Sequence, residues 1–182
     1  MRTALALSVI AFLCVVTAQA QTIANQAYAN ETADWNVAPT YAIRTSQYHA
    51  PTPTSIPSGR IIYTFWLNQA LQGPNRPLLV NVLDGNTVRA LPGSVWFSRG
   101  GHGTALTDPN QQRFESRLAA LTGGNKAAPV VFYCLSSECW LSYNATLRAL
   151  QAGYSNAMWY RGGVEAWQAA GLPTTVMQTD QW

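Results

Sequence analysis

The chain has 182 residues, 48% of them hydrophobic, and its 11 Lys and Arg residues against 8 Asp and Glu residues give a formal net charge of +3. This length suits one domain with its own core and is too short for two. The charged residues form no basic stripe and no acidic tail, so the sequence predicts neither nucleic-acid binding nor attraction to an anionic membrane.

The first segment has the pattern of a secretory signal peptide. Arg2 precedes an apolar stretch from Ala4 to Val16, and Ala18-Gln19-Ala20 supplies the small residues of a cleavage site. The stretch is too short for a stable membrane anchor, and no later apolar segment reaches membrane length. We therefore expect residues 1–20 to be removed after Ala20 and the mature protein to be periplasmic or secreted.

Residues 21–60 are rich in Ala, Asn, Thr and Pro and follow neither the helical nor the strand period. Their prolines enforce extended backbone. Four aromatic residues nevertheless recur along the segment, and aromatics are scarce in segments that stay disordered. We expect an extended arm that packs along the main domain through Tyr28, Trp35, Tyr41 and Tyr48.

From residue 61 onward, short apolar strand patterns alternate with helical patterns. The predicted strands are Ile61–Thr64, Pro77–Leu83, Ser94–Phe97, Pro129–Cys134 and Ala157–Tyr160, and the predicted helices are Leu67–Leu71, a helix from Asp108-Pro109 to Gly123, Ser142–Ala152 and Gly163–Ala170. Alternation with short connections is typical of a parallel sheet covered by helices on both faces. The sequence therefore predicts an α/β domain with a central, mostly parallel sheet of about five strands.

Two cysteines remain after the signal peptide, and they flank the loop between a predicted strand and a predicted helix. Cys134 ends the strand and Cys139 lies five residues later. The carboxyl end of a strand in an open sheet is where ligands bind, and a helix N-terminus there favours an anion such as a thiolate or persulfide. In an oxidising compartment the pair can equally exist as a disulfide, so the sequence leaves both states open.

Three further residues are candidates for this site, each with an ordinary alternative. His102 lies in a glycine-rich loop that follows a strand, Arg161 follows the strand ending at Tyr160, and Trp140 closes the cysteine loop. They are candidates for a base, an anion partner and a pocket wall; the alternatives are a loop histidine, a solvated arginine and a core residue. The cysteines and the distant His49 have no metal-ligand spacing, so we expect no metal and no cofactor.

The order of motifs resembles the rhodanese-like domain family. The resemblance covers Ile61–Pro173 and rests on LLVNVL, LPGSVWF, VVFYC, ALQAGY and RGGVEAWQAAGLP. It implies a three-layer fold and assigns residues 61–182 to a rhodanese-like domain. The run from Cys139-Trp140 to Ala145 is closest to an exported subgroup named for a CXXCW motif and associated with pyrroloquinoline-quinone (PQQ)-dependent catabolism.

By position, the resemblance makes Cys134 the nucleophile that accepts a sulfane sulfur. The backbone cradle of the family would be formed here by Leu135, Ser136, Ser137, Glu138 and Cys139. The loop departs from the family pattern, because it is about two residues longer and carries no arginine between Cys134 and Ser142. Asn81 also replaces an acidic residue, and four residues separate the cysteines. These departures weaken the expectation of thiosulfate turnover.

Two hypotheses follow. The first is an exported sulfurtransferase or thiol-exchange enzyme in which Cys134 forms a persulfide or mixed disulfide and Cys139 resolves it, with a small sulfur donor or a protein thiol as partner. The alternative is a catalytically inactive rhodanese-like module that docks a periplasmic partner such as a quinone-dependent dehydrogenase system.

Overall fold

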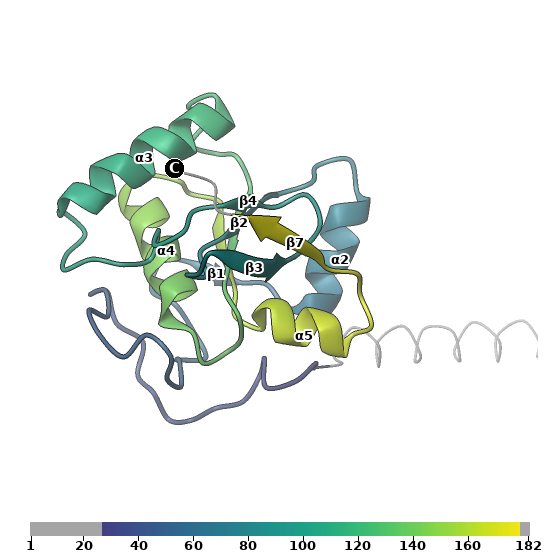
Figure 1. The fold of residues 1–182 in the computed structure, drawn as a ribbon. Coiled ribbons are helices and arrows are strands. Elements are labelled where there is room, and N and C mark those ends of the chain that lie inside the picture. Colours follow the sequence, from purple (N-terminus) through teal and green to yellow (C-terminus); the bar gives the residue numbers. More distant parts are fainter. Residues whose placement is uncertain (1–26, 179–182) are drawn as a thin grey trace, which may run out of the picture.

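The computed structural model describes residues 27–178, and the predicted signal peptide lies outside this range. Five strands form one sheet in the order β1-β6-β5-β2-β4, and every neighbouring pair is parallel (Figure 1). The strands are β1 (Arg60–Ile61), β2 (Leu78–Asn81), β4 (Val95–Trp96), β5 (Val130–Tyr133) and β6 (Ala157–Tyr160). The predicted parallel sheet is therefore confirmed.

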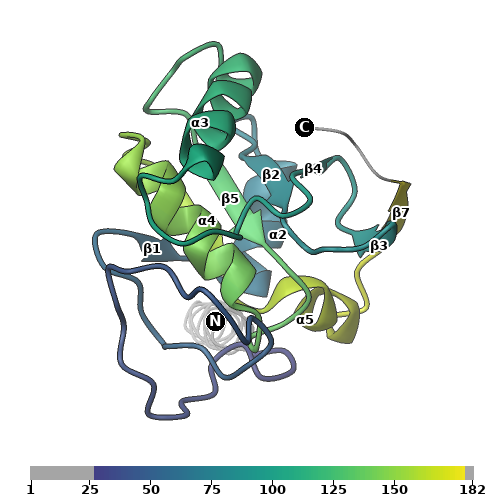
Figure 2. The same ribbon diagram turned by 60° about the vertical axis from the view of Figure 1, so that its left-hand side comes forward.

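Four helices cover the two faces of this sheet, as Figure 2 shows. α3 (Pro109–Thr122) and α4 (Trp140–Gln151) pack on one face, whereas α2 (Thr64–Gln72) and α5 (Gly163–Ala169) pack on the other. The fold is a three-layer α/β domain, as the sequence predicted. No helix in the described range is both long and apolar enough to cross a membrane.

The central strand β5 explains why the sequence shows a continuous apolar run there. Val130 and Phe132 enter the core with α3 and α4, whereas Val131 and Tyr133 enter the core with α2 and α5. Successive side chains of a strand point to opposite faces, so a strand buried on both sides needs an apolar residue at every position.

A second, two-stranded antiparallel sheet was not predicted. It pairs β3 (Thr87–Ala90) with β7 (Thr175–Gln178), from Thr87 opposite Gln178 to Ala90 opposite Thr175. β7 is mostly exposed, so it lacks the apolar alternation that identifies a strand in sequence.

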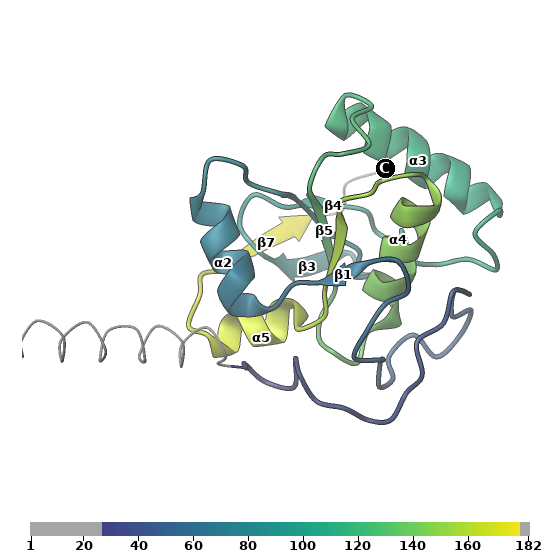
Figure 3. The same ribbon diagram turned by 180° about the vertical axis from the view of Figure 1, so that it is seen from behind.

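The arm, whose described part is residues 27–59, runs along the edge of the molecule at which α4 begins (Figure 3). The Tyr143 hydroxyl donates to the Thr40 carbonyl and accepts from the Thr40 N–H, both at 2.8 Å. The Asn144 amide makes the same reciprocal pair with the backbone of Arg44. Of the four arm aromatics, Tyr41 does not pack as expected, because 71% of it is exposed.

An arm residue also explains where α2 begins. The buried Glu31 carboxylate accepts from the backbone N–H of Thr64 at 2.9 Å and from its hydroxyl at 2.7 Å. A carboxylate at this position satisfies an N–H group that the first helical turn leaves unpaired. The predicted strand Ile61–Thr64 is therefore shortened, and the helix starts at Thr64.

A buried ion pair joins α3 to α4. Asp108 caps α3 as predicted, and its carboxylate accepts two hydrogen bonds of 3.0 Å from the Arg148 guanidinium. Burial alone would raise the pKa of Asp108, but the hydrogen bonds from Arg148 and from the N–H groups of Thr104 and Ala105 outweigh it and lower the pKa to about 2. Asp108 therefore stabilises the fold only while it is ionised.

We predict that Asp108→Asn removes about 2 kcal/mol of stability at pH 7 and little at pH 2. Above about pH 5 the carboxylate is ionised in both folded and unfolded chains, so its contribution is complete; as the pH falls from about 5 to about 2, the unfolded chain takes up the proton first and the contribution is lost. Urea unfolding at several pH values measures this. The exposed Asp34→Asn serves as the control, and a deficit of Asp108→Asn that persists at pH 2 would contradict the assignment.

Candidate active site

Cys134 and Cys139 form a disulfide, with their Cα atoms 6.1 Å apart. Cys134 directly follows β5, and Cys139 is the N-cap residue of α4, so the bond spans the turn from strand to helix. Both residues are buried, with exposed fractions of 0% and 1%. Of the two states that the sequence left open, the structure contains the oxidised one.

Two backbone carbonyl groups at the start of the cysteine loop are bonded to α5. The Cys134 and Leu135 carbonyls accept from the N–H groups of Val164 and Glu165 at the start of α5, at 3.1 and 2.9 Å. In a trans peptide the N–H of the next residue points the opposite way, so the N–H groups of Leu135 and Ser136 point away from α5. Within the described range, these two N–H groups donate to no protein atom. Their hydrogen-bonding capacity is therefore not used by the described part of the protein.

The double glycine at the start of α5 permits the close contact with this loop. Gly163 has a φ of +60°, and a Cβ on it would lie 2.6 Å from the Cys134 carbonyl oxygen. A residue with a side chain would be strained there and would push α5 away from the loop. Gly163 thereby positions the peptide groups that follow Cys134.

The arm covers the other side of the loop with residues 48–52, which we call the strap. His49 and Cys139 form an antiparallel bridge, in which the Ala50 N–H donates to the Glu138 carbonyl at 2.9 Å and the Trp140 N–H donates to the Tyr48 carbonyl at 2.8 Å. The Thr52 hydroxyl donates to the Ser137 carbonyl at 2.6 Å. Sequence analysis missed this cover, although the extended backbone predicted for the arm suits such pairing.

Arg161, a candidate anion partner with a solvated arginine as the alternative, binds the arm. Its five donor groups bond to the Thr52 hydroxyl and to the backbone carbonyls of Asn30, Glu31, Ala33 and Thr52, at 2.7 to 3.4 Å. The guanidinium also lies over the Trp35 ring, 4.9 Å from its centroid, and burial lowers its pKa. In this structure Arg161 has no donor left for a substrate.

The other predicted site residues are distributed around the loop. Leu135 and Glu138 are exposed, Ser136 is half-buried and Ser137 is buried. Trp140 packs under the strap and donates its indole N–H to the Pro51 carbonyl at 3.0 Å, so it does not wall an open pocket.

His102 is held by an acidic side chain. Its Nε2 atom pairs with the Asp84 carboxylate, and its ring lies 4.4 Å from that of Tyr48. Its loop packs against the first two turns of α4, where the Asn144 amide donates to the Gly101 carbonyl. Among residues 27–178, no group of three or more His, Cys, Asp or Glu residues could hold a metal ion.

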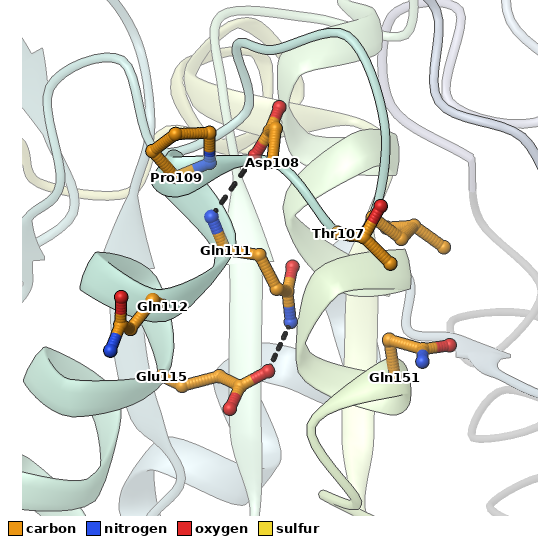
Figure 4. Close-up of a pocket in the computed structure, with 8 residues that line it drawn as sticks. Thr107, Asp108, Pro109, Gln111, Gln112, Glu115 and Gln151 are labelled. Carbon is orange, nitrogen blue, oxygen red and sulfur yellow. Dashed lines mark hydrogen bonds between the residues drawn. The ribbon is translucent and has the colours of Figure 1, made fainter.

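A pocket lies at the opposite end of α4, between Gln151 and the start of α3 (Figure 4). The Gln111 amide crosses it and donates to the Glu115 carboxylate at 2.7 Å and to the Arg148 carbonyl at 3.0 Å. The Asp108 carboxylate is already bonded to Arg148. Because these polar groups are paired with one another, they are less able to bind or activate a ligand than the groups of the cysteine loop.

Comparison with known proteins agrees with the fold. A model of the rhodanese-like domain family matches residues 66–170, more than half of the 182-residue chain. A search among curated proteins gives no match.

Three solved structures are similar. A thiosulfate sulfurtransferase from Pseudomonas aeruginosa is 26% identical with a TM-score of 0.47, covering 69% of this chain and 21% of its own. A variant of EanB in complex with hercynine is 20% identical with a TM-score of 0.48, and the match covers 68% of this chain and 33% of the EanB chain. A full-length protein from Lactobacillus plantarum is 17% identical with a TM-score of 0.47, covering 64% and 88%. The chain thus spans about a fifth of the sulfurtransferase and a third of EanB.

We predict that Arg161→Gln lowers the free energy of unfolding by on the order of 3 kcal/mol and makes the arm sensitive to protease, because four carbonyl groups lose a charged donor. Arg161→Lys should recover only part of the loss, since an ammonium group has three donors. Urea unfolding and limited proteolysis measure both effects. The control is the exposed Arg89→Gln; an arm that stays resistant in Arg161→Gln would contradict this role.

Proposed function

The chain belongs to the rhodanese-like domain family, and from that premise we propose that it is a sulfurtransferase or thiol-exchange enzyme that works through its cysteine pair. Cys134 is the sulfur acceptor and Cys139 is the resolving thiol. The observation that carries the proposal is the disulfide between a cysteine at the carboxyl end of β5 and the N-cap residue of α4. A nucleophile and a partner thiol are thus already within bonding distance.

The reaction begins with the reduced pair. The Cys134 thiolate attacks the outer sulfur of a persulfide donor R–S–SH, a bond forms between the two sulfurs, and R–S⁻ leaves and takes up a proton. The product is a persulfide on Cys134. The N–H groups of Leu135 and Ser136, which directly follow Cys134 and donate to no protein atom in the described range, are the groups that we assign to stabilising its negative charge.

Two outcomes are open to the persulfide. An acceptor thiol can take the outer sulfur, which returns Cys134 to the thiolate. Alternatively, Cys139 attacks the inner sulfur of the Cys134 persulfide, forms the observed disulfide and releases HS⁻. A dithiol reductant must then supply two electrons to reopen the pair.

The charge around the loop favours neutral or monoanionic donors over thiosulfate. No arginine or lysine lies between Cys134 and Ser142, and the donors of Arg161 are occupied by the arm. The exposed carboxylates of Glu138 and Glu165 flank the loop. A dianion would meet repulsion there without charge-assisted hydrogen bonds.

The signal-peptide pattern of residues 1–20 supports an exported enzyme, acting in the periplasm or outside the cell, where a dithiol partner is needed to reduce the pair. The run from Cys139 to Ala145 supports a role in the PQQ-associated subgroup. Both extensions are part of the proposal.

A second candidate function is a binding module without catalysis that docks an exported partner. The burial of both cysteines favours it, because neither sulfur is open to a donor in the oxidised structure. The exposed side chains of Tyr41 and Trp66 would then be available for contact. A transfer assay separates the two candidates.

We predict that the reduced protein takes sulfur from a small persulfide and takes little or none from thiosulfate. Cys134→Ser should abolish transfer, and Cys139→Ser should slow turnover while leaving the first acceptance of sulfur intact. Glu138→Arg should raise thiosulfate activity, because it places a cation on the exposed side of the loop. Sulfide release and the mass of the Cys134 peptide report each step. If the wild-type protein accepts sulfur from neither donor, the sulfurtransferase proposal is wrong and the binding module is the remaining candidate function.

We also predict that an alkylating reagent modifies Cys134 before Cys139 in the reduced, folded protein. The free N–H groups beside Cys134 favour its thiolate, whereas the neighbouring Glu138 carboxylate disfavours that of Cys139. Peptide mapping of partly labelled protein gives the order. Glu138→Gln should narrow the difference in labelling rate between the two cysteines. If Cys139 is labelled before Cys134, the roles of the two cysteines are the reverse of those proposed.

A further inference from the structure

The disulfide cannot react in the conformation described above. Reduction requires a thiolate to reach one of the two sulfurs. The two cysteines are 0% and 1% exposed, so neither sulfur can be reached from solution. Some part of the cover must move before a reductant can restore the thiol pair.

The strap is the part of the cover that can move at least cost. α4 and α5 bury apolar side chains in the two main cores, so displacing either helix would open the domain. The strap instead has exposed residues at His49 and Pro51, and two backbone and two side-chain hydrogen bonds hold it to the loop and to Trp140. Its contacts with the cores are limited to the partly buried Tyr48 and Ala50.

Thr52 is the point at which the strap is fastened. Its buried hydroxyl donates to the Ser137 carbonyl at 2.6 Å and accepts from Nε of Arg161 at 3.0 Å. Its carbonyl accepts from Nη2 of Arg161, also at 3.0 Å. One residue therefore links the arm, the cysteine loop and the end of β6.

We propose that the strap is a gate over the cysteine pair, fastened by the Thr52 hydroxyl, and that its undocking precedes each reduction of the disulfide. This inference rests on the proposed thiol chemistry of the pair. Once the strap has left, a dithiol attacks Cys139, which the strap borders, and the electrons of the broken bond go to Cys134 as a thiolate. The second thiol of the reductant then displaces Cys139, so the reductant becomes the disulfide.

A gate predicts how the rate of disulfide reduction depends on the concentration of reductant. If undocking precedes attack, the rate of reduction by dithiothreitol stops rising at high reductant concentration, where it equals the opening rate. Thr52→Val keeps the shape of the side chain and removes the hydroxyl. It should raise the rate of reduction at low reductant by about tenfold, because the loss of buried hydrogen bonds favours the open state. Thr52→Ser keeps the hydroxyl and should stay close to wild type.

A second control separates opening of the strap from loss of general stability. Val88→Ala removes core volume in β3, away from the arm, and should leave the reduction rate unchanged under conditions where the protein stays folded. Free thiols are counted after quenching, and the free energy of unfolding of each variant is measured in urea.

The outcomes are distinct. Equal rates for Thr52→Val and wild type would overturn the gate, and so would an equal acceleration in Val88→Ala, because reduction would then proceed through general unfolding. If Thr52→Val is reduced faster but still takes no sulfur from a persulfide, the gate stands and the proposed sulfur transfer is wrong.

Discussion

The guanidinium of Arg161 is the interaction on which the arrangement around the cysteines depends. It follows β6 and reaches arm segments more than 100 residues earlier in the chain, at Asn30, Glu31, Ala33 and Thr52. An arginine offers five donors in a fixed plane, and here each has an oxygen partner. A buried cation without partners would be very costly, so the arm and the end of β6 must come together for either to be satisfied. The strap reaches the cysteine loop as a consequence.

The sequence predicts the sheet and its helices because the relevant signals are local. The apolar run before Cys134 identifies β5, and Asp108-Pro109 identifies the start of α3. Features that depend on distant partners could not be predicted. The start of α2 is set by Glu31, 33 residues before Thr64, and β3 pairs with β7 from the far end of the chain. Neither Glu31 nor β7 lies in a sequence pattern that indicates its distant partner.

The same division applies to the candidate site. The place of Cys134 at a strand end could be predicted, because the apolar run stops there. Its bond to Cys139 depends on how the loop curls, which brings the two Cα atoms to 6.1 Å. The role of Arg161 was missed, because the sequence around an arginine that precedes two glycines does not indicate whether its side chain faces solvent or binds the arm. For Trp140 the sequence left a pocket wall and a core residue as alternatives, and only the path of residues 48–52 explains its burial.

The way the arm is held has a consequence for its response to the medium. Arg161 is surrounded by carbonyl dipoles and one hydroxyl, and none of its hydrogen bonds goes to a carboxylate. Salt screens interactions between exposed charges much more than it weakens buried contacts of a cation with neutral oxygens. Carbonyl groups also do not titrate, so acid cannot remove these acceptors. These five hydrogen bonds are thus largely independent of ionic strength and acidity, whereas the disulfide that the strap covers responds to the supply of reductant.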